Sequence, residues 1–349
     1  MTTTPGTDGP PAGHAVPGPG PAWFGAVMGT GILATLLQLH AGHLAVFALA
    51  APVFLGLAWA LLVGLGAGFL RSIVRDRTVW SRSAGDAAAL PLWGLVSMGL
   101  LSVGSATFTV VEALAPDLRT IALGVEAALW VAGTVLGLAT AVGFTHWLIS
   151  RRPDHPLPTW ALPMVPPMVT ATVAGLLAGQ VDPGPLRTAL VAVGAICFVG
   201  ALVLGGGVIA VAFHHAWRRT PIPVALSPST WIPLGIMGQS TAAAQVLTGP
   251  SLSQAARLYG VVALSAGAVF GAFAVVSTAR GLRARMPFNP GWWAMTFPLG
   301  TCALGAHYLG WEVVSLATVL ALCGTWSLCA AASVHAVLGH RASTASRPG

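Results

Sequence analysis

The chain has 349 residues, of which 55% are hydrophobic and only 7% are charged, and its mean hydropathy is +0.80. A soluble domain carries about 25% charged residues, so this composition excludes a soluble globular protein and indicates one that crosses a membrane several times. The net charge is +7, and every basic charge is an arginine, because the chain contains no lysine. We assign this charge to membrane topology and contact with membrane lipid, and we expect no nucleic-acid partner.

Residues 1–20 form the first distinct segment, rich in proline, glycine and threonine. The segment has neither the basic start nor the apolar centre of a secretory signal peptide. We expect a disordered tail.

Ten apolar runs follow the tail, each long enough to cross about 30 Å of hydrocarbon as a helix. They lie at 22–40, 47–70, 90–111, 120–148, 159–180, 186–213, 229–248, 256–279, 291–309 and 312–338. The sequence therefore predicts one ten-span transmembrane domain over residues 21–340 and a short second tail over 341–349.

The arginines gather in the loops that follow the even-numbered spans. Those loops and the C-terminal tail hold 13 of the 16 arginines, namely Arg71, Arg75, Arg77, Arg82, Arg151, Arg152, Arg218, Arg219, Arg280, Arg283, Arg285, Arg341 and Arg347. The opposite loops hold only Arg119, Arg187 and Arg257. By the positive-inside rule, both termini lie in the cytoplasm, and we expect the plasma (cell) membrane as the location.

Polar residues and prolines alternate between successive spans. The odd-numbered spans hold 21 Ser, Thr or Gln in 102 residues, whereas the even-numbered spans hold 13 in 132. Six prolines predict kinks in the odd spans, whereas the even spans contain only Pro52; the six are Pro91, Pro163, Pro166, Pro167, Pro233 and Pro298.

This alternation predicts an all-α membrane protein built from five helical hairpins. The odd helices would form an inner ring around a pore and the even helices an outer ring against lipid, because polar groups and broken backbone are tolerated only against protein or water. The alternative is that these residues serve only helix packing.

Hydroxyl and amide side chains of the odd spans are the candidate pore-lining groups, because their partial positive charges can replace part of an anion's hydration shell. The candidates are Thr30, Ser102, Thr170, Thr172, Gln239, Thr241 and Thr296. No acidic or basic residue lies deep within an odd span, which favours a neutral path for anions over a carrier coupled to protons or sodium. Glu126 and Glu312 lie within the first turns of even spans.

Phe297 is the candidate gate. It precedes Pro298 within a polar-lined odd span, where a bulky ring either packs a helix crossing or blocks a path.

No motif indicates catalysis, a cofactor or a metal. The chain lacks HExxH, paired aspartates, a GxSxG at membrane depth and a Walker A sequence, so we expect no enzyme. The four cysteines lie in apolar runs without CxxC spacing and are interpreted as buried small residues. The histidines near the span ends, including His40, His43 and His307, are interpreted as interfacial anchors.

Three ordered motifs resemble the tellurite-resistance/dicarboxylate transporter family, which includes bacterial TehA, the plant slow anion channels and malate and sulfite transporters. They are PAWFGAVMGTG at 21–31, WALPMVPP at 160–167 and WWAMTFP at 292–298. The resemblance implies a homotrimer whose protomers each contain a five-helix pore, with Phe297 as the plug of that pore. It also implies small-anion substrates such as malate, sulfite, nitrate and chloride, or tellurite-linked export.

The sequence thus predicts passage of small anions through a pore within each protomer. Two alternatives stay open at this point. One is proton-coupled dicarboxylate uptake, and the other is a membrane scaffold or sensor that transports nothing.

Overall fold

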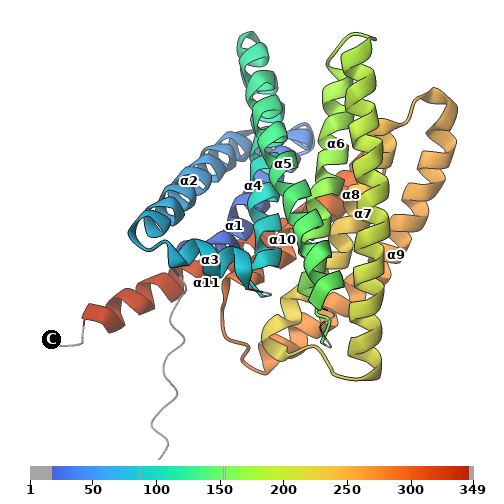
Figure 1. Ribbon diagram of the computed structural model, residues 1–349. Coiled ribbons are helices and arrows are strands. Elements are labelled where there is room, and N and C mark those ends of the chain that lie inside the picture. The colour runs from blue at the N-terminus through green and yellow to red at the C-terminus, as the bar shows by residue number, and fades with distance from the viewer. Residues whose placement is uncertain (1–17, 87, 152, 154, 346–349) are drawn as a thin grey trace, which may run out of the picture.

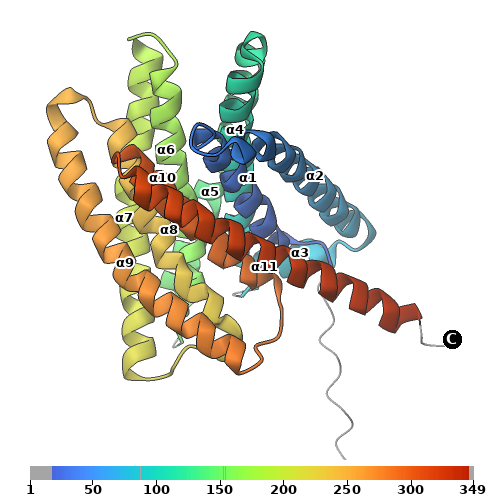
Figure 2. The same cartoon turned by 180° about the vertical axis from the view of Figure 1, so that it is seen from behind.

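The computed structural model describes residues 18–86, 88–151, 153 and 155–345, and every regular element within these residues is a helix (Figures 1 and 2). Most of the predicted N-terminal tail, residues 1–17, lies outside the described residues, as do residues 346–349 of the C-terminal one. The last helix, α11, continues through Ala345, beyond the predicted end of the transmembrane domain.

Five short helices each begin with a segment of 3-10 helix (η). They are η1 Pro21–Trp23 with α1 Phe24–Leu39, η2 Leu90–Leu92 with α4 Trp93–Leu114, η4 Pro158–Met164 with α6 Val165–Gly179, η5 Val224–Trp231 with α8 Ile232–Leu247, and η7 Pro290–Met295 with α10 Thr296–Tyr308. We call these five the inner helices.

Five longer helices alternate with them along the chain. They are α2 Ala45–Arg75, α5 Arg119–Arg151, α7 Pro185–Arg218, α9 Ser253–Arg283 and α11 Glu312–Ala345. We call these the outer helices. The remaining elements are α3 Thr78–Gly85, η3 Pro116–Leu118 and η6 Pro250–Leu252.

Burial separates the two sets of helices. In the most apolar windows of α1, α4 and α6, 72% to 94% of residues are buried, against 17% to 28% for the five outer helices. Twelve of the 16 residues of α8 and nine of the 13 of α10 are also buried. Each inner helix contacts the next, in the order α1, α4, α6, α8, α10, and α10 returns to contact α1. Each inner helix also packs against the outer helix that follows it.

Eight helices among the described residues are long and apolar enough to cross a membrane, and α8 and α10 are not among them. Length alone does not set these two apart, because α8 and α10 have 16 and 13 residues of continuous α-helix and α1 and α6, which are among the eight, have 16 and 15. The prediction of an all-α, multi-pass membrane protein is confirmed, whereas the count of ten spans stays a prediction.

The six prolines that predict kinks lie close to the starts of inner helices. Pro91 and Pro163 lie in the 3-10 segments η2 and η4, and the other four lie in the first turns of α6, α8 and α10. A first-turn backbone N–H has no partner within the helix, so proline costs no hydrogen bond there. Each proline thus stands within two residues of the change from 3-10 to α geometry.

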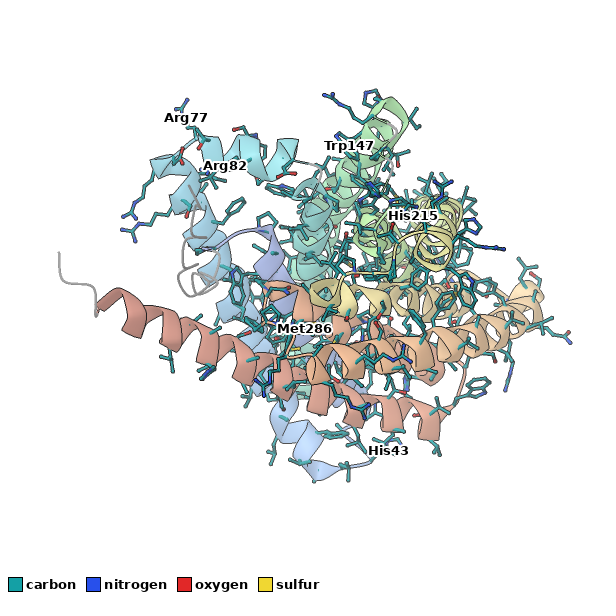
Figure 3. The ribbon with its side chains drawn as sticks, turned by 90° about the horizontal axis from the view of Figure 1, so that it is seen from below. His43, Arg77, Arg82, Trp147, His215 and Met286 are labelled. Carbon is teal, nitrogen blue, oxygen red and sulfur yellow. The ribbon has the colours of Figure 1, made fainter. Side chains whose placement is uncertain are left out.

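Three helix ends that carry arginine lie on the same side of the molecule. Arg151, Arg218 and Arg283 end α5, α7 and α9, at the bottom of Figure 1, while the α4–α5, α6–α7 and α8–α9 turns lie at the top. Arg77 and Arg82 project at the periphery of the view from below (Figure 3). Arg82 pairs with Asp76, with 2.8 Å between Nη2 and Oδ2, and hydrogen bonds from Thr78 lower the pKa of this aspartate.

Glycines allow the closest approach between inner helices. A Cβ on Gly238 of α8 would lie 2.7 Å from Cα of Cys302 on α10, and one on Gly305 of α10 would lie 2.7 Å from the carbonyl oxygen of Gly238. No side chain fits at such distances, so the two backbones touch directly.

Candidate functional site

Two cavities lie between the inner helices, and residues from all five inner helices line each of them. The first has a volume of about 60 Å³, and its lining includes hydroxyl and amide side chains; we call it the polar cavity. The second has a volume of about 10 Å³ and is lined only by apolar residues and glycine; we call it the apolar cavity. A cavity needs roughly 10–15 Å³ to hold one water molecule, so the first has room for several and the second for one at most.

Phe297 is the single residue that lines both cavities. Its side chain is buried, with 3% of the residue exposed. The polar cavity extends from it toward the C-terminal ends of the inner helices, past Leu39 and Tyr308, and the apolar cavity toward their N-terminal ends, past Met28 and Met98. The ring therefore separates a polar space from an apolar one.

The segment before Phe297 holds this ring in place through contacts to the backbone and to an outer helix. Asn289 caps η7 by accepting a hydrogen bond from the backbone N–H of Gly291, at 2.9 Å. The Trp293 indole N–H donates to Ser333 Oγ of α11, at 3.0 Å. Thr296 Oγ1 donates to the Trp293 carbonyl oxygen, at 2.8 Å. The backbone on the N-terminal side of Phe297 is thus fixed, and Pro298 restricts it on the other side.

Thr172 of α6 and Gln239 of α8 form the best-defined polar pair in the polar cavity. Gln239 Nε2 donates to Thr172 Oγ1 at 2.8 Å, and both residues are at most 2% exposed. Gln239 Oε1 has no hydrogen-bond partner among the described residues. A half-turn of the amide would let Thr172 donate to Oε1 and leave the NH₂ group, a hydrogen-bond donor, free for a ligand.

Two serines of α4 also line the polar cavity. Ser102 Oγ donates to the Met28 carbonyl oxygen of α1, at 3.0 Å. Ser105 Oγ donates to Glu126 Oε1 of α5, at 3.2 Å, and Glu126 is 2% exposed. A buried carboxyl group therefore lies directly behind the cavity wall. The sequence placed Glu126 on an outer helix and gave no sign that it faces inward.

The seven predicted pore-lining residues divide into two groups. Ser102, Thr172 and Gln239 line the polar cavity, together with Thr35, Ser105, Thr109 and Tyr308, which the sequence did not single out.

The other four predicted residues line neither cavity, and their hydroxyl groups bond within or between helices. Thr30 Oγ1 donates to the Ala26 carbonyl oxygen at 2.7 Å and accepts from the Trp326 indole at 3.0 Å. Thr170 bonds Thr134 of α5, and Thr241 and Thr296 bond carbonyl oxygens of their own chain segments. Only one side of each inner helix faces the cavities, so residue type alone does not tell these two groups apart.

A sequence profile described as SLAC1, voltage-dependent anion channel, matches residues 20–334, which is most of the chain. The chain belongs to the SLAC1 family. The family resemblance read from the three motifs is thereby confirmed, and with it the assignment to a family of membrane proteins that transport anions.

Individual proteins that are similar to this chain extend the comparison. The sulfite efflux pump of Arthroderma otae is 26% identical over 332 residues, which cover 85% of this chain and 83% of the pump. That of Arthroderma benhamiae is 27% identical over 328 residues, covering 84% and 82%. An uncharacterized transporter of Methanocaldococcus jannaschii is 23% identical over 294 residues, covering 82% of each chain. The SLAC1-family similarity thus runs through all five inner helices.

Proposed function

We propose that the chain passes small anions along the axis enclosed by its five inner helices, and that Phe297 constricts this path. The observation that carries the proposal is that Phe297 alone lines both cavities on this axis. With the ring in its present position the path is closed, because an anion that reaches it would lose hydration without gaining polar partners.

The polar cavity supports an anionic substrate through its hydroxyl and amide groups. These groups can donate hydrogen bonds, and no charged side chain lines the cavity. From the named relatives we propose sulfite-type oxyanions first. Four-carbon dicarboxylates such as malate, and tellurite-type oxyanions, are the other members of the proposed substrate class.

We propose that all ten inner and outer helices cross the plasma membrane, with both termini in the cytoplasm. The concentration of arginine after the even spans supports this orientation. In this arrangement α8 and α10 cross the membrane as buried helices. Their α-helical parts are short, but the 3-10 segments η5 and η7 add to their length.

The decisive experiment compares Phe297→Ala with the unaltered chain in proteoliposomes. Removing the ring joins the two cavities, so we expect anion flux to rise by at least about tenfold, which corresponds to lowering a barrier by about 1.4 kcal/mol. Sulfite, malate, nitrate and chloride are compared side by side. Leu299→Ala, on the same helix but lining neither cavity, is the matched control and should leave flux low.

Unchanged flux in a folded Phe297→Ala protein would overturn the constriction. A membrane scaffold or sensor would show no flux of any of the four anions in either protein, which would overturn the transport proposal itself.

A second candidate, proton-coupled uptake of dicarboxylates, gains support from Glu126. A carboxyl group buried within a span is the type of group that couples proton movement to transport, and this one bonds a serine of the polar cavity. Under this proposal an imposed pH gradient drives malate accumulation, and Glu126→Gln abolishes the accumulation while leaving downhill flux. A channel shows no accumulation in either protein.

We further propose a homotrimer embedded in lipid. The outer helices expose large apolar side chains along their lengths, such as Val199, Val203 and Val211 on α7, which suits both lipid and protein contact. Native mass spectrometry from detergent is expected to give three chains per complex, and a monomer would overturn this proposal.

A further inference from the structure

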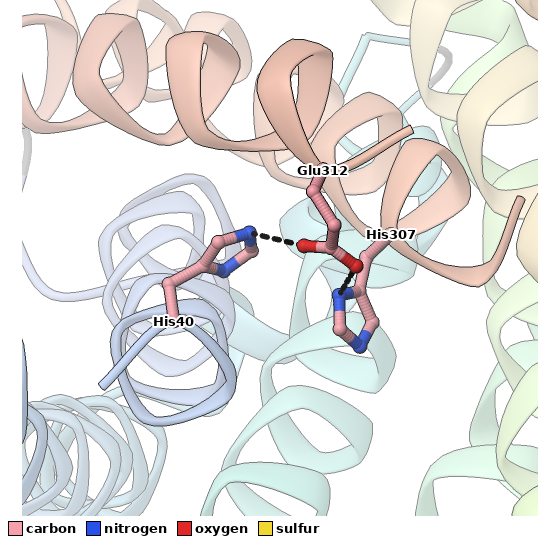
Figure 4. Close-up of side chains that lie close together, drawn as sticks. All are labelled: His40, His307 and Glu312. Carbon is pink, nitrogen blue, oxygen red and sulfur yellow. Dashed lines mark ion pairs between the residues drawn. The ribbon is translucent and has the colours of Figure 1, made fainter. Parts of the chain in front are cut away.

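Three groups with lone pairs meet where α1 and α10 end and α11 begins (Figure 4). They are His40, which directly follows α1, His307 near the end of α10, and Glu312, the first residue of α11. One nitrogen or oxygen from each lies within 4.8 Å of the others. The sequence interpretation of these histidines as interfacial anchors did not anticipate that His40 is fully buried.

Hydrogen bonding fixes which nitrogen of His40 is free. Its Nδ1 lies 3.0 Å from the Leu36 carbonyl oxygen, which can only accept, so Nδ1 carries the proton. Nε2 then has a lone pair, and among the described residues it has no hydrogen-bond partner. It faces Glu312 Oε2 at 3.7 Å. A ring N–H held by a backbone carbonyl is the usual support of a histidine that binds a metal.

His307 completes the arrangement. Its Nδ1 lies 3.2 Å from Glu312 Oε1, in a geometry that makes no hydrogen bond, and this buried atom has no other hydrogen-bond partner in the described chain. Two unpartnered imidazole nitrogens therefore flank one carboxylate. Burying a polar atom without a partner is unfavourable, so a ligand bound by both nitrogens would stabilise the fold.

The donor set also suits a cation, because the Nε2 lone pair of His40 is free to bind a metal ion. The side chain of Glu312 is 43% exposed, which gives an ion access from solvent.

We propose that His40, His307 and Glu312 bind a divalent transition-metal ion of the Zn²⁺ type, with water as the fourth ligand. Two histidines and one glutamate form a ligand set that zinc uses in proteins, and tetrahedral bonds of about 2.0–2.1 Å place ligand atoms roughly 3.3 Å apart. The spacings to the two Glu312 oxygens, 3.7 and 3.2 Å, lie near this value, and the three ligand atoms lie within 4.8 Å of one another, so the side chains would draw closer around an ion.

Two of the proposed metal ligands are sequence neighbours of residues that line the polar cavity. Leu39 and Tyr308, the sequence neighbours of His40 and His307, both line that cavity. A bound ion would therefore tie α1, α10 and α11 together at this end of the inner helices.

The test is calorimetric titration of Zn²⁺ into the chelator-treated full chain in detergent, purified without a polyhistidine tag. We expect one ion per chain, and at least a tenfold loss of affinity in each of His40→Ala, His307→Ala and Glu312→Gln. His335 is an exposed histidine further along α11, and the His335→Ala variant should bind Zn²⁺ as the unaltered chain does.

Two further measurements guard against misfolded variants. Zn²⁺ should raise the melting temperature of the unaltered chain and of His335→Ala but not of the three ligand variants, because only binding to the folded state stabilises it. Co²⁺ should give the visible absorption of a tetrahedral site in the unaltered chain. Equal Zn²⁺ affinity in the unaltered chain and a folded His40→Ala/His307→Ala double variant would overturn the proposal, as would the absence of binding in both. Neither result depends on anion flux.

Discussion

The inner and outer helices differ in how they meet their surroundings. An inner helix such as α6 is covered by protein on nearly all sides, starts with a 3-10 segment and carries prolines in its first turn. An outer helix such as α7 is 34 residues of continuous α-helix, largely exposed.

The contrast shows where the chain tolerates change. Outer helices meet a uniform apolar surrounding on most of their surface, so composition is sufficient to specify them. Inner helices meet other backbones and two small cavities, so individual atoms matter there. Four pairs of substitutions test this contrast, from the largest expected effect to the smallest.

Gly238→Ala should have the largest effect, because its Cβ would run into the backbone of α10, which cannot move aside as a side chain can. We expect a loss of at least about 3 kcal/mol or failure to fold, seen as a much lower melting temperature in detergent.

Gly235→Ala, one turn earlier on α8, is the matched control. Its Cβ would make only ordinary contacts, 3.8 Å from Pro298 Cγ and 3.9 Å from Val165 Cγ1, so it should melt near the unaltered chain. Equal melting of the two variants would contradict the close packing of α8 on α10.

Gln239→Glu should lower anion flux strongly in the Phe297→Ala background. It places a negative charge in the polar cavity without changing side-chain size, and repulsion of about 3 kcal/mol at 5–6 Å opposes entry of an anion. We expect flux in proteoliposomes to fall by at least about tenfold. Gln245→Glu, on the same helix but outside both cavities, should leave flux within about twofold. A similar loss in both variants would mean that the charge acts through the fold.

Thr172→Val and Thr30→Val separate a residue of the cavity from a packing residue. In the same background, loss of the Thr172 hydroxyl should lower flux about fivefold, as expected for one neutral hydrogen bond of about 1 kcal/mol.

Thr30→Val should leave flux unchanged but cost about 1 kcal/mol of stability, because the Trp326 indole loses its acceptor. Flux and melting temperature, measured on the same preparations, check both outcomes. Reduced flux in Thr30→Val would mean that Thr30 lines the anion path.

Gly206→Ala on α7 should have the smallest effect, a stabilisation of up to about 1 kcal/mol. Its Cβ would meet nothing within 4 Å, and alanine favours the helix over glycine. The adjacent Gly205→Ala should destabilise instead, because its Cβ would press on Ile236 of α8 and lie 3.3 Å from Met164 Cβ. Thermal melts of the two variants should shift in opposite directions.

Composition and periodicity predicted a large part of the architecture. Hydrophobic length located a helix at each of the ten apolar runs, and the density of hydroxyl groups and prolines distinguished the buried set from the exposed set. These are properties of whole helices that sum over many residues, so errors at single positions cancel.

The sequence by itself determined the class of protein, the order of the helices and the family. Only the tertiary structure decided which hydroxyl groups share the polar cavity with Gln239, that Glu126 faces inward from α5, and that His40 meets His307 and Glu312. The physical reason is rotation: the facing of a side chain depends on how each helix turns about its axis, and contacts between residues as distant in sequence as 40 and 312 set that turn.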